Sequence, residues 1–330
     1  MKKNQNKTII NEIDSDIVGL FAAENLINEQ KKVLAYIPSF FTTASLPLKN
    51  LNKPVFIRKG SNGVTLILTS PKNVPFGRYG RLLLSVLTTH AVLSKEKDSP
   101  VLIEYNNLSD LLNELQLPRQ RGKDIKEQLD CFSSCSFTFE QRIKEVKPGV
   151  YFKELYEGNA PQEEVEVITQ TTGNIRFTNG IQFKELKSGK DAGRVGYFKI
   201  LLSSEFAGFC QRHAVPIDYT AYKNISSPVG KDIYAWLVYR NNGLKAPVFI
   251  PREKLVEQFM PLSDNAQKDK GKMESNNFYV IVDLIKELKA KYYPELKVRF
   301  DEGGIGITLF KSPTPVLKDD VRYALITANI

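Results

Sequence analysis

Apolar residues recur at helical spacing in two separate stretches of the chain. In the first stretch they predict a helix over residues 82–91, a strand at 101–105 and a second helix over 108–115. A third helix is expected over 123–132, and residues 136–139 alternate between polar and apolar as a strand does. Asn107 stands just before the second helix, where its short polar side chain suits an N-cap.

The second stretch repeats this order of elements. Helical spacing predicts a helix over residues 233–240, a strand follows at 248–250, and a helix is expected over 251–259. A longer amphipathic helix is predicted over 275–288, with Ser275 or Asn276 as its cap. Residues 296–310 then form a predicted hairpin around a Gly-Gly turn.

A helix, a strand, two helices and a β-hairpin, in this order, are typical of a winged helix, which is a helix-turn-helix with an attached hairpin. The sequence therefore predicts an α+β fold with tandem winged-helix domains. The expected divisions are an N-terminal tail and hairpin segment (1–70), a first winged-helix domain (71–218), a second one (219–317) and a C-terminal tail (318–330).

Between these stretches the sequence favours β structure. Residues 55–57 and 64–68 are strand-like and flank a Lys-Gly-Ser-Asn-Gly turn, which predicts a further hairpin. Most of 151–218 is expected to be β and to complete the sheet of the first domain. The glycine-containing basic run at 187–194 is expected to be an exposed loop.

The charge of the chain favours a polyanionic partner. The 330 residues carry 46 Lys and Arg against 37 Asp and Glu, a net charge of +9 with a pI near 9.2. Such an excess attracts polyanions over long range. It is also compatible with a merely basic soluble protein, so charge alone does not decide the partner.

Several classes of chemistry have no support in the sequence. Cys131, Cys135 and Cys210 do not stand at metal-ligand spacing with a histidine, and they are expected to be buried thiols of a reducing cytoplasm. His90 and His213 are the only histidines, so the paired-histidine site of a rolling-circle nickase is missing. There is no Walker-type loop, secretory signal or membrane-spanning run. We expect no enzymatic activity, no cofactor and no metal.

The candidate DNA contacts lie where each winged helix would meet the major groove, at the start of its last helix. In the first domain they are Arg119, Gln120, Arg121, Lys123 and Lys126, of which Arg can bond guanine and Gln adenine with two bonds. In the second they are Lys268, Lys270, Lys272, Ser275, Asn276, Asn277 and Tyr279.

Three further arginines are weaker candidates. Arg299 in the second hairpin is expected to reach a phosphate or the minor groove, or else to pair with an acidic neighbour across the hairpin. Arg78 and Arg81, at the start of the first helix, are weak phosphate candidates. The alternative for all the basic runs is a solvated surface with a few ion pairs, and for the asparagines it is an ordinary helix cap.

The order of several motifs resembles the plasmid-encoded RepA-type replication initiators, over about residues 71–240. These motifs are VPFG at 74–77, RLLL at 81–84, TTHAV at 88–92, LSDLL at 108–112, RQRGK at 119–123, QL at 128–129, VPID at 215–218, SSP at 226–228, DIYAWL at 232–237 and YR at 239–240. The first 70 residues depart from the family's pattern.

This resemblance implies a plasmid replication initiator with tandem winged-helix domains. Such proteins bind direct repeats, called iterons, in the origin, help to open an A+T-rich stretch and recruit the host helicase or its loader. Many repress their own promoter as dimers, which controls copy number, and initiate as monomers. Three other functions remain open: a winged-helix repressor without a replication role, a nicking enzyme, and a protein-interaction module that binds no duplex.

Overall fold

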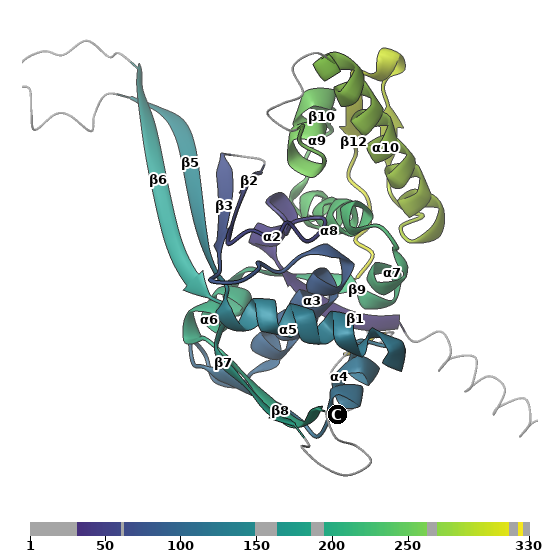
Figure 1. Ribbon diagram of the computed structural model, residues 1–330. Helices are drawn as coiled ribbons and strands as arrows, with labels where there is room; N and C mark the ends of the chain where they lie inside the picture. Colours follow the sequence, from purple (N-terminus) through teal and green to yellow (C-terminus); the bar gives the residue numbers. More distant parts are fainter. Residues whose placement is uncertain are drawn as a thin grey trace, which may run out of the picture.

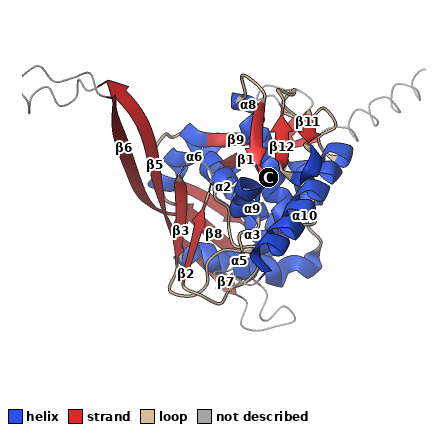
Figure 2. Ribbon diagram, turned by 90° about the horizontal axis from the view of Figure 1, so that it is seen from above, coloured by secondary structure: helices blue, strands red, loops and turns tan. Residues whose placement is uncertain are grey.

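The structure is a computed structural model that describes residues 32–60, 63–148, 164–185, 195–262, 269–316 and 323–325. It is a mixed α and β structure in which one continuous hydrophobic core reaches from β1 to β12. Figures 1 and 2 show helices and short sheets packed together, with one long pair of strands standing out on one side. The predicted loop at 187–194 falls outside the described residues, as does residue Lys268.

The first stretch folds into what we call the first module. Its elements are α3 (Gly77–Leu93), β4 (Val101–Tyr105), α4 (Leu108–Glu114), α5 (Gly122–Ser134), β7 (Thr178–Glu185) and β8 (Val195–Leu202). The three strands form a sheet in the order β4-β8-β7, and both pairings are antiparallel. The predicted cap of α4 is confirmed, because the Asn107 side chain accepts a hydrogen bond from the backbone N–H of Asp110.

The second stretch folds into the second module with the same element order. It contains α8 (Pro228–Gly243), β10 (Val248–Pro251), α9 (Arg252–Phe259), α10 (Lys270–Lys291), β11 (Val298–Phe300) and β12 (Gly306–Leu309). Its sheet has the order β10-β12-β11, so in both modules the last strand lies between the other two. The predicted hairpin is confirmed, and a short 3-10 helix, η4 (Glu302–Gly304), forms its turn.

The first module contains an inserted hairpin that its counterpart lacks. β5 (Ser136–Pro148) pairs with β6 (Glu164–Arg176), and Figure 1 shows the two strands projecting from the body. β5 also pairs with β3 (Val64–Thr69), which pairs with β2 (Val55–Lys59), so the hairpin predicted in this region is confirmed.

The strand expected at 136–139 consequently lies in this four-stranded sheet and not in the sheet of the first module. The reason is a cluster of aromatic rings beneath β5. The Phe137 ring lies 5.3 Å from the Phe41 ring and 4.8 Å from the Phe177 ring, and the Phe139 ring lies 5.0 Å from the Phe40 ring. Rings at these separations attract one another beyond the area that they bury.

The N-terminal segment is part of the core and not a separate unit that ends at residue 70. β1 (Lys32–Pro38) pairs antiparallel with β9 (Ala214–Asp218) and parallel with β13 (Tyr323–Leu325). α2 (Ser39–Thr43) buries Phe40 and Phe41, and α6 (Ser204–His213) and α7 (Tyr219–Asn224) flank β9 in the chain. The expected C-terminal tail thus supplies a strand, and the expected boundaries at residues 70 and 318 do not divide the molecule.

Candidate nucleic-acid interface

The turn between α4 and α5 carries a cluster of exposed cations. Arg119, Gln120 and Arg121 form a single 3-10 turn, η1 (Arg119–Arg121), that leads directly into α5. All three side chains and that of Lys123 are exposed. Arg121 lies 3.4 Å from an Asp124 carboxylate oxygen in a weak surface ion pair. Four predicted contact residues are therefore together at one helix tip, where basic and amide groups meet solvent.

Along α5, the exposed positive charge lies at this tip. Beyond the first turn, the side of α5 that faces solvent carries the carboxylates of Glu127 and Asp130. The opposite side packs into the core through Ile125, Leu129 and Phe132. Lys126, which was also predicted as a contact, is partly buried and has an interaction partner. An anionic partner would be attracted to the N-terminal end of α5 and repelled farther along it.

In the second module the long helix α10 begins earlier than predicted. It starts at Lys270, so Ser275 and Asn276 lie in its second turn and the expectation that one of them caps the helix was wrong. Gly271 and the neighbouring polar residues disfavour a helix in isolation, and packing of the later turns outweighs this local preference. Lys270 and Lys272 are consequently exposed residues of the first turn.

One exposed stripe of α10 combines three of the predicted contacts. Lys272, Asn276 and Tyr279 are all exposed and stand at i, i+4 and i+7, which places them on one face of a helix. Tyr279 is 55% exposed, and a Cβ atom at Gly304 in the hairpin turn would lie 3.1 Å from its hydroxyl oxygen. The stripe therefore runs beside the turn of the β11–β12 hairpin, and we call it the α10 stripe.

Asn277 points away from this stripe. Its side-chain amide nitrogen donates a 2.9 Å hydrogen bond to the carbonyl oxygen of Met260, and the residue lines a small pocket with Pro47 and Leu48. This hydrogen bond holds the amide toward the pocket and away from the exposed face of the helix. The expectation that Asn277 meets DNA therefore does not agree with its place in the structure. Ser275, which also lies on α10, is half-buried and is not part of the exposed α10 stripe.

Arg299 is on the opposite face of the hairpin from α10. Its neighbour Phe300 lies under the Lys286 ammonium, 5.5 Å from the ring centre, which places α10 on the Phe300 side. Successive strand residues face opposite sides, so Arg299 faces outward. There its guanidinium pairs with Asp301 at 3.2 Å and donates to the Thr308 hydroxyl at 3.3 Å. Arg299 therefore pairs with an acidic neighbour, but that neighbour is two positions along the chain and not across the hairpin as the alternative predicted, where Thr308 stands.

Arg81 is a buried structural residue, so its prediction as a phosphate contact was wrong. Only 2% of the residue is exposed. Its guanidinium makes two hydrogen bonds to the Asp232 carboxylate, at 2.6 and 2.7 Å, and two more to the carbonyl oxygens of Leu46 and Pro47. Because Arg81 belongs to α3 and Asp232 to α8, this ion pair joins the first helices of the two modules.

Arg78 is half-buried and also directed inward. It donates to the carbonyl oxygen of Lys223 at 3.0 Å, and its Nε is buried without a hydrogen-bond partner. Its guanidinium carbon lies 5.9 Å from the centre of the Tyr79 ring. Little of its charge is thus directed toward an external phosphate.

The hairpin of the first module carries basic residues that the sequence reasoning missed. Lys184 on β7 and Lys199 on β8 each lie 5.3 Å from the centre of the Tyr197 ring. Lys199 also forms an ion pair with Glu104 at 2.5 Å, and the hydrogen bond to Glu104 raises the pKa of Lys199. The alternation of residues along 197–202 places Tyr197 and Lys199 on one face, which was the signal available in the sequence.

His90 and the three cysteines are packed against other residues of the protein. The Nε2 of His90 lies 2.8 Å from Glu114, which also accepts a hydrogen bond from Tyr105, so His90 is half-buried in a polar cluster. All three cysteines are free and buried, and burial raises the pKa of Cys131 to about 11.

In the described ranges there is no metal-binding group of three or more His, Cys, Asp or Glu. None of the helices described is both long and apolar enough to cross a membrane.

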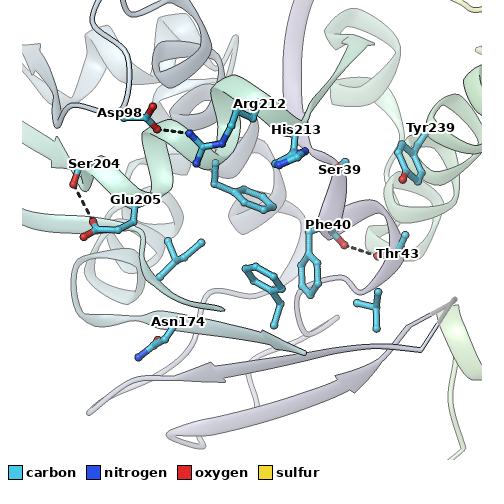
Figure 3. Close-up of a pocket in the computed structure, with 14 residues that line it drawn as sticks. Ser39, Phe40, Thr43, Asp98, Asn174, Ser204, Glu205, Arg212, His213 and Tyr239 are labelled. Atoms are coloured by element: carbon cyan, nitrogen blue, oxygen red, sulfur yellow. Dashed lines mark hydrogen bonds and ion pairs between the residues drawn. The ribbon is translucent and has the colours of Figure 1, made fainter. Parts of the chain in front are cut away.

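A pocket with a volume of about 730 Å³ lies between α2, α6 and the β5–β6 sheet (Figure 3). Aromatic rings line it, with the Phe209 ring 5.8 Å from Phe139 and 5.3 Å from His213. Its charged groups are engaged with their neighbours, since Arg212 pairs with Asp98 and Ser204 bonds Glu205. Aromatic rings therefore make up much of the lining, and its arginine is already paired with Asp98.

Comparison with known proteins gives structural likenesses only. No family model and no curated protein matches the chain. Among solved structures, domains 2 and 3 of RctB match with a TM-score of 0.46 and 12% identity, over 82% of this chain and 96% of that one. A second structure of these RctB domains matches with a TM-score of 0.43 and 10% identity, over 81% of this chain and 92% of that one.

The Pi initiator protein in complex with iteron DNA matches with a TM-score of 0.41 and 14% identity, over 84% of this chain and 95% of that one. With TM-scores below 0.5 and identities of at most 14%, these likenesses do not assign a family to this chain.

Proposed function

We propose that both modules are winged helices and that the protein binds duplex DNA with the two of them together. The observation that carries the proposal is the repeated topology. Each module has the order α-β-α-α-β-β with its last strand in the middle of the sheet, and each has exposed basic residues at the start of its last helix. In a helix-turn-helix that is the part of the protein that enters the major groove.

Within this proposal, some of the contact residues provide affinity for DNA and others provide sequence specificity. Arg119, Arg121 and Lys123 of the first module, and Lys270 and Lys272 of the second, give most of the affinity by neutralising phosphates. Gln120 and Asn276 have side-chain amides that can bond adenine with two bonds, so they contribute specificity. Both amides are exposed at their helix. Lys184 and Lys199 extend the basic surface along the hairpin of the first module.

The biological role proposed for this binding is initiation of plasmid replication in the bacterial cytoplasm. The protein binds direct repeats in the origin, promotes opening of an adjacent A+T-rich stretch and recruits the host helicase or its loader. It represses its own promoter as a homodimer and so regulates copy number. The role is supported by the ordered motifs between residues 71 and 240, and it requires no catalytic residue, cofactor or metal.

Binding to the DNA that flanks the gene tests the proposal. We expect that DNA to contain direct repeats spaced by about two helical turns, so that two modules can reach major grooves on one face. Fluorescence anisotropy should give an affinity for a repeat duplex that exceeds that for a scrambled duplex by roughly a thousandfold or more. Equal affinity for both duplexes, or no binding at all, would contradict the proposal.

A plasmid maintenance assay separates the initiator from the repressor. The gene supplied in trans should sustain a plasmid that carries only the flanking repeats and the A+T-rich stretch. Specific binding without maintenance would instead identify a repressor with the same modules. A covalent protein–DNA adduct on supercoiled plasmid would contradict the absence of enzymatic activity and favour a nicking enzyme.

A further inference from the structure

A second basic surface lies in a hollow between the β2–β3 hairpin, which joins the sheet of the inserted hairpin, and the second module, away from the tip of α5 and the α10 stripe. We call it the intermodule hollow. Its volume is about 430 Å³, and it is lined by the end of the β2–β3 hairpin, by α8, by β10 and by α9. The residues that matter for its chemistry are Lys59, Trp236, Arg240, Phe249, Lys254 and Glu257. None of them belongs to the predicted DNA contacts.

Cations from three different elements converge on the intermodule hollow. Lys59 ends β2 and is exposed, Arg240 lies in the last turns of α8, and Lys254 lies on α9. Glu257 is the one carboxylate in the lining, and it pairs with Lys254 at 3.2 Å. Two positive charges are left in excess, from residues far apart in sequence that the fold brings to one hollow.

Arg240 is the most informative of these cations. Its Nε is buried and makes no hydrogen bond within the described part of the chain. A buried donor without a partner costs about 1–3 kcal/mol in a folded protein. Arg240 itself is partly exposed and lines the hollow, and a phosphate oxygen is the acceptor that a guanidinium bonds best.

The hairpin that carries Lys59 is held in place by its glycine. A Cβ atom at Gly60 would lie 2.3 Å from the carbonyl oxygen of Thr43, so only glycine allows β2 to approach α2 this closely. Gly63 has a φ of +71°, a left-handed conformation that glycine adopts without strain. Both glycines line the hollow, and they set the position of Lys59 at its rim.

Aromatic side chains line another part of the hollow. Phe249 of β10 is 46% exposed, although it is a large apolar residue, and Trp236 of α8 is 2% exposed and packs edge-on against Phe259. An exposed ring beside unpaired cations is suited to a ligand with a planar apolar part and an anionic part. A nucleotide has both, because its base stacks on aromatic rings and its phosphate bonds Arg and Lys.

We propose that the intermodule hollow binds the phosphate group of a nucleotide, with Arg240 and Lys59 as the phosphate ligands and Phe249 beside the base. The phosphate can come from a free nucleotide or from a single DNA strand. The proposal does not depend on binding to origin repeats, because the hollow and the predicted groove contacts share no residue.

Trp236 is the only tryptophan in the chain, so its fluorescence reports on the intermodule hollow directly. The full-length protein is titrated with ATP, with inorganic phosphate and with a short single-stranded oligothymidylate, in the absence of duplex. We expect a saturable fluorescence change. Arg240→Gln and Lys59→Gln should each weaken binding by about tenfold or more, the effect of losing one charge-assisted hydrogen bond.

Lys95→Gln provides the matched control, because Lys95 is an exposed cation remote in sequence from the hollow's lining. Binding of ATP and phosphate supports a free-nucleotide site, and binding of the oligonucleotide alone supports a strand site. If Arg240→Gln does not fold by circular dichroism, Lys59→Gln decides, since Lys59 is exposed. No saturable change with any of the three probes overturns the proposal, and so does an unchanged affinity in the folded variants. Duplex binding is measured separately, so either proposal can fail alone.

Discussion

The two modules share a topology but distribute their charge differently. In the first module the last helix, α5, has 13 residues, and its exposed cations are gathered at η1 and the first turn. In the second, α10 has 22 residues, and its exposed polar stripe continues for two turns beside the hairpin. Topology follows the hydrophobic pattern, which both stretches share. The surface that contacts a partner is determined by the exposed polar residues, and the hydrophobic pattern does not constrain which residues these are.

The modules also differ in what they contribute to the contact between them. The first helix of the first module, α3, supplies the buried cation Arg81, and the first helix of the second, α8, supplies the buried carboxylate of Asp232. This pair lies in the shared core, so it sets how the two helix tips are oriented relative to each other. A change there should affect both modules, whereas a change at either tip should affect one.

The largest effect is expected from breaking this buried pair. Asp232→Ala leaves the Arg81 charge without its partner, which should destabilise the protein by about 3–5 kcal/mol. Urea denaturation followed by circular dichroism measures the loss. The matched control is Glu287→Ala, which removes an exposed partner of Lys291 and should cost about 0.5 kcal/mol or less. Equal effects of the two substitutions would show that the buried pair does not hold the modules together.

A pH-dependent stability is expected from Lys231, the neighbour of Asp232. Burial, with Arg78 and Arg81 nearby, lowers the pKa of Lys231 to about 6. Between pH 6 and its ordinary value the unfolded chain binds a proton that the folded protein does not, so stability rises with pH by up to about 1.4 kcal/mol per unit. Denaturation at pH 7, 8 and 9 should show this rise, and Lys231→Met should flatten it. A wild-type stability that falls over this range contradicts the sign.

Adjacent asparagines of α10 distinguish DNA contact from packing. Asn276→Ala should weaken binding to a repeat duplex by about 1–3 kcal/mol and relax the preference at one base pair. Asn277→Ala should leave that affinity unchanged and reduce stability by about 1 kcal/mol, because it removes the hydrogen bond to Met260. Anisotropy titrations and urea denaturation on both variants measure the two effects. The reverse pattern would mean that the α10 stripe is not the DNA-facing side.

The smallest effect is expected at the hairpin of the second module. Arg299→Gln removes an exposed charge that already pairs with Asp301 and faces away from α10. Duplex affinity should change by less than about 0.5 kcal/mol. Arg121→Ala, at the tip of the first module, should cost about 1.5–3 kcal/mol in the same titration, because it removes a charge-assisted hydrogen bond to phosphate. A larger loss for Arg299→Gln would place the outer face of the hairpin on the DNA.

Much of the local structure was predictable because it depends on residues close in sequence. The helices over 82–91, 108–115 and 123–132 and the strand at 101–105 are present, and the Asn107 cap is made with a residue three positions away. Periodicity and capping chemistry act at this range.

The remaining features depend on contacts that no local pattern contains. Arg81 and Asp232 are 151 positions apart in the sequence. Nothing near Arg81 in the sequence predicts that its side chain is buried, because the carboxylate that pairs with it is brought there only by the fold. β5 pairs with β3 in a sheet whose β5 strand packs against aromatic rings of α2. The helix α10 begins at Lys270 because its later turns pack against the core. The four tip residues of the first module, predicted as DNA contacts, are exposed, as such contacts must be. In the second module the sequence could not distinguish the exposed residues of the α10 stripe from the inward-facing Asn277, because this depends on which face of α10 packs against the core.

The salt dependence of duplex binding tests the two-module account most directly. The logarithm of the binding constant should fall by about 0.9 per neutralised phosphate for each unit of log salt concentration. Arg119→Gln/Arg121→Gln and Lys270→Gln/Lys272→Gln should each lower the magnitude of the slope by roughly 1.8, and the combined variant by roughly twice that amount. A slope that changes with only one of the two double variants would contradict the claim that both modules hold the same DNA.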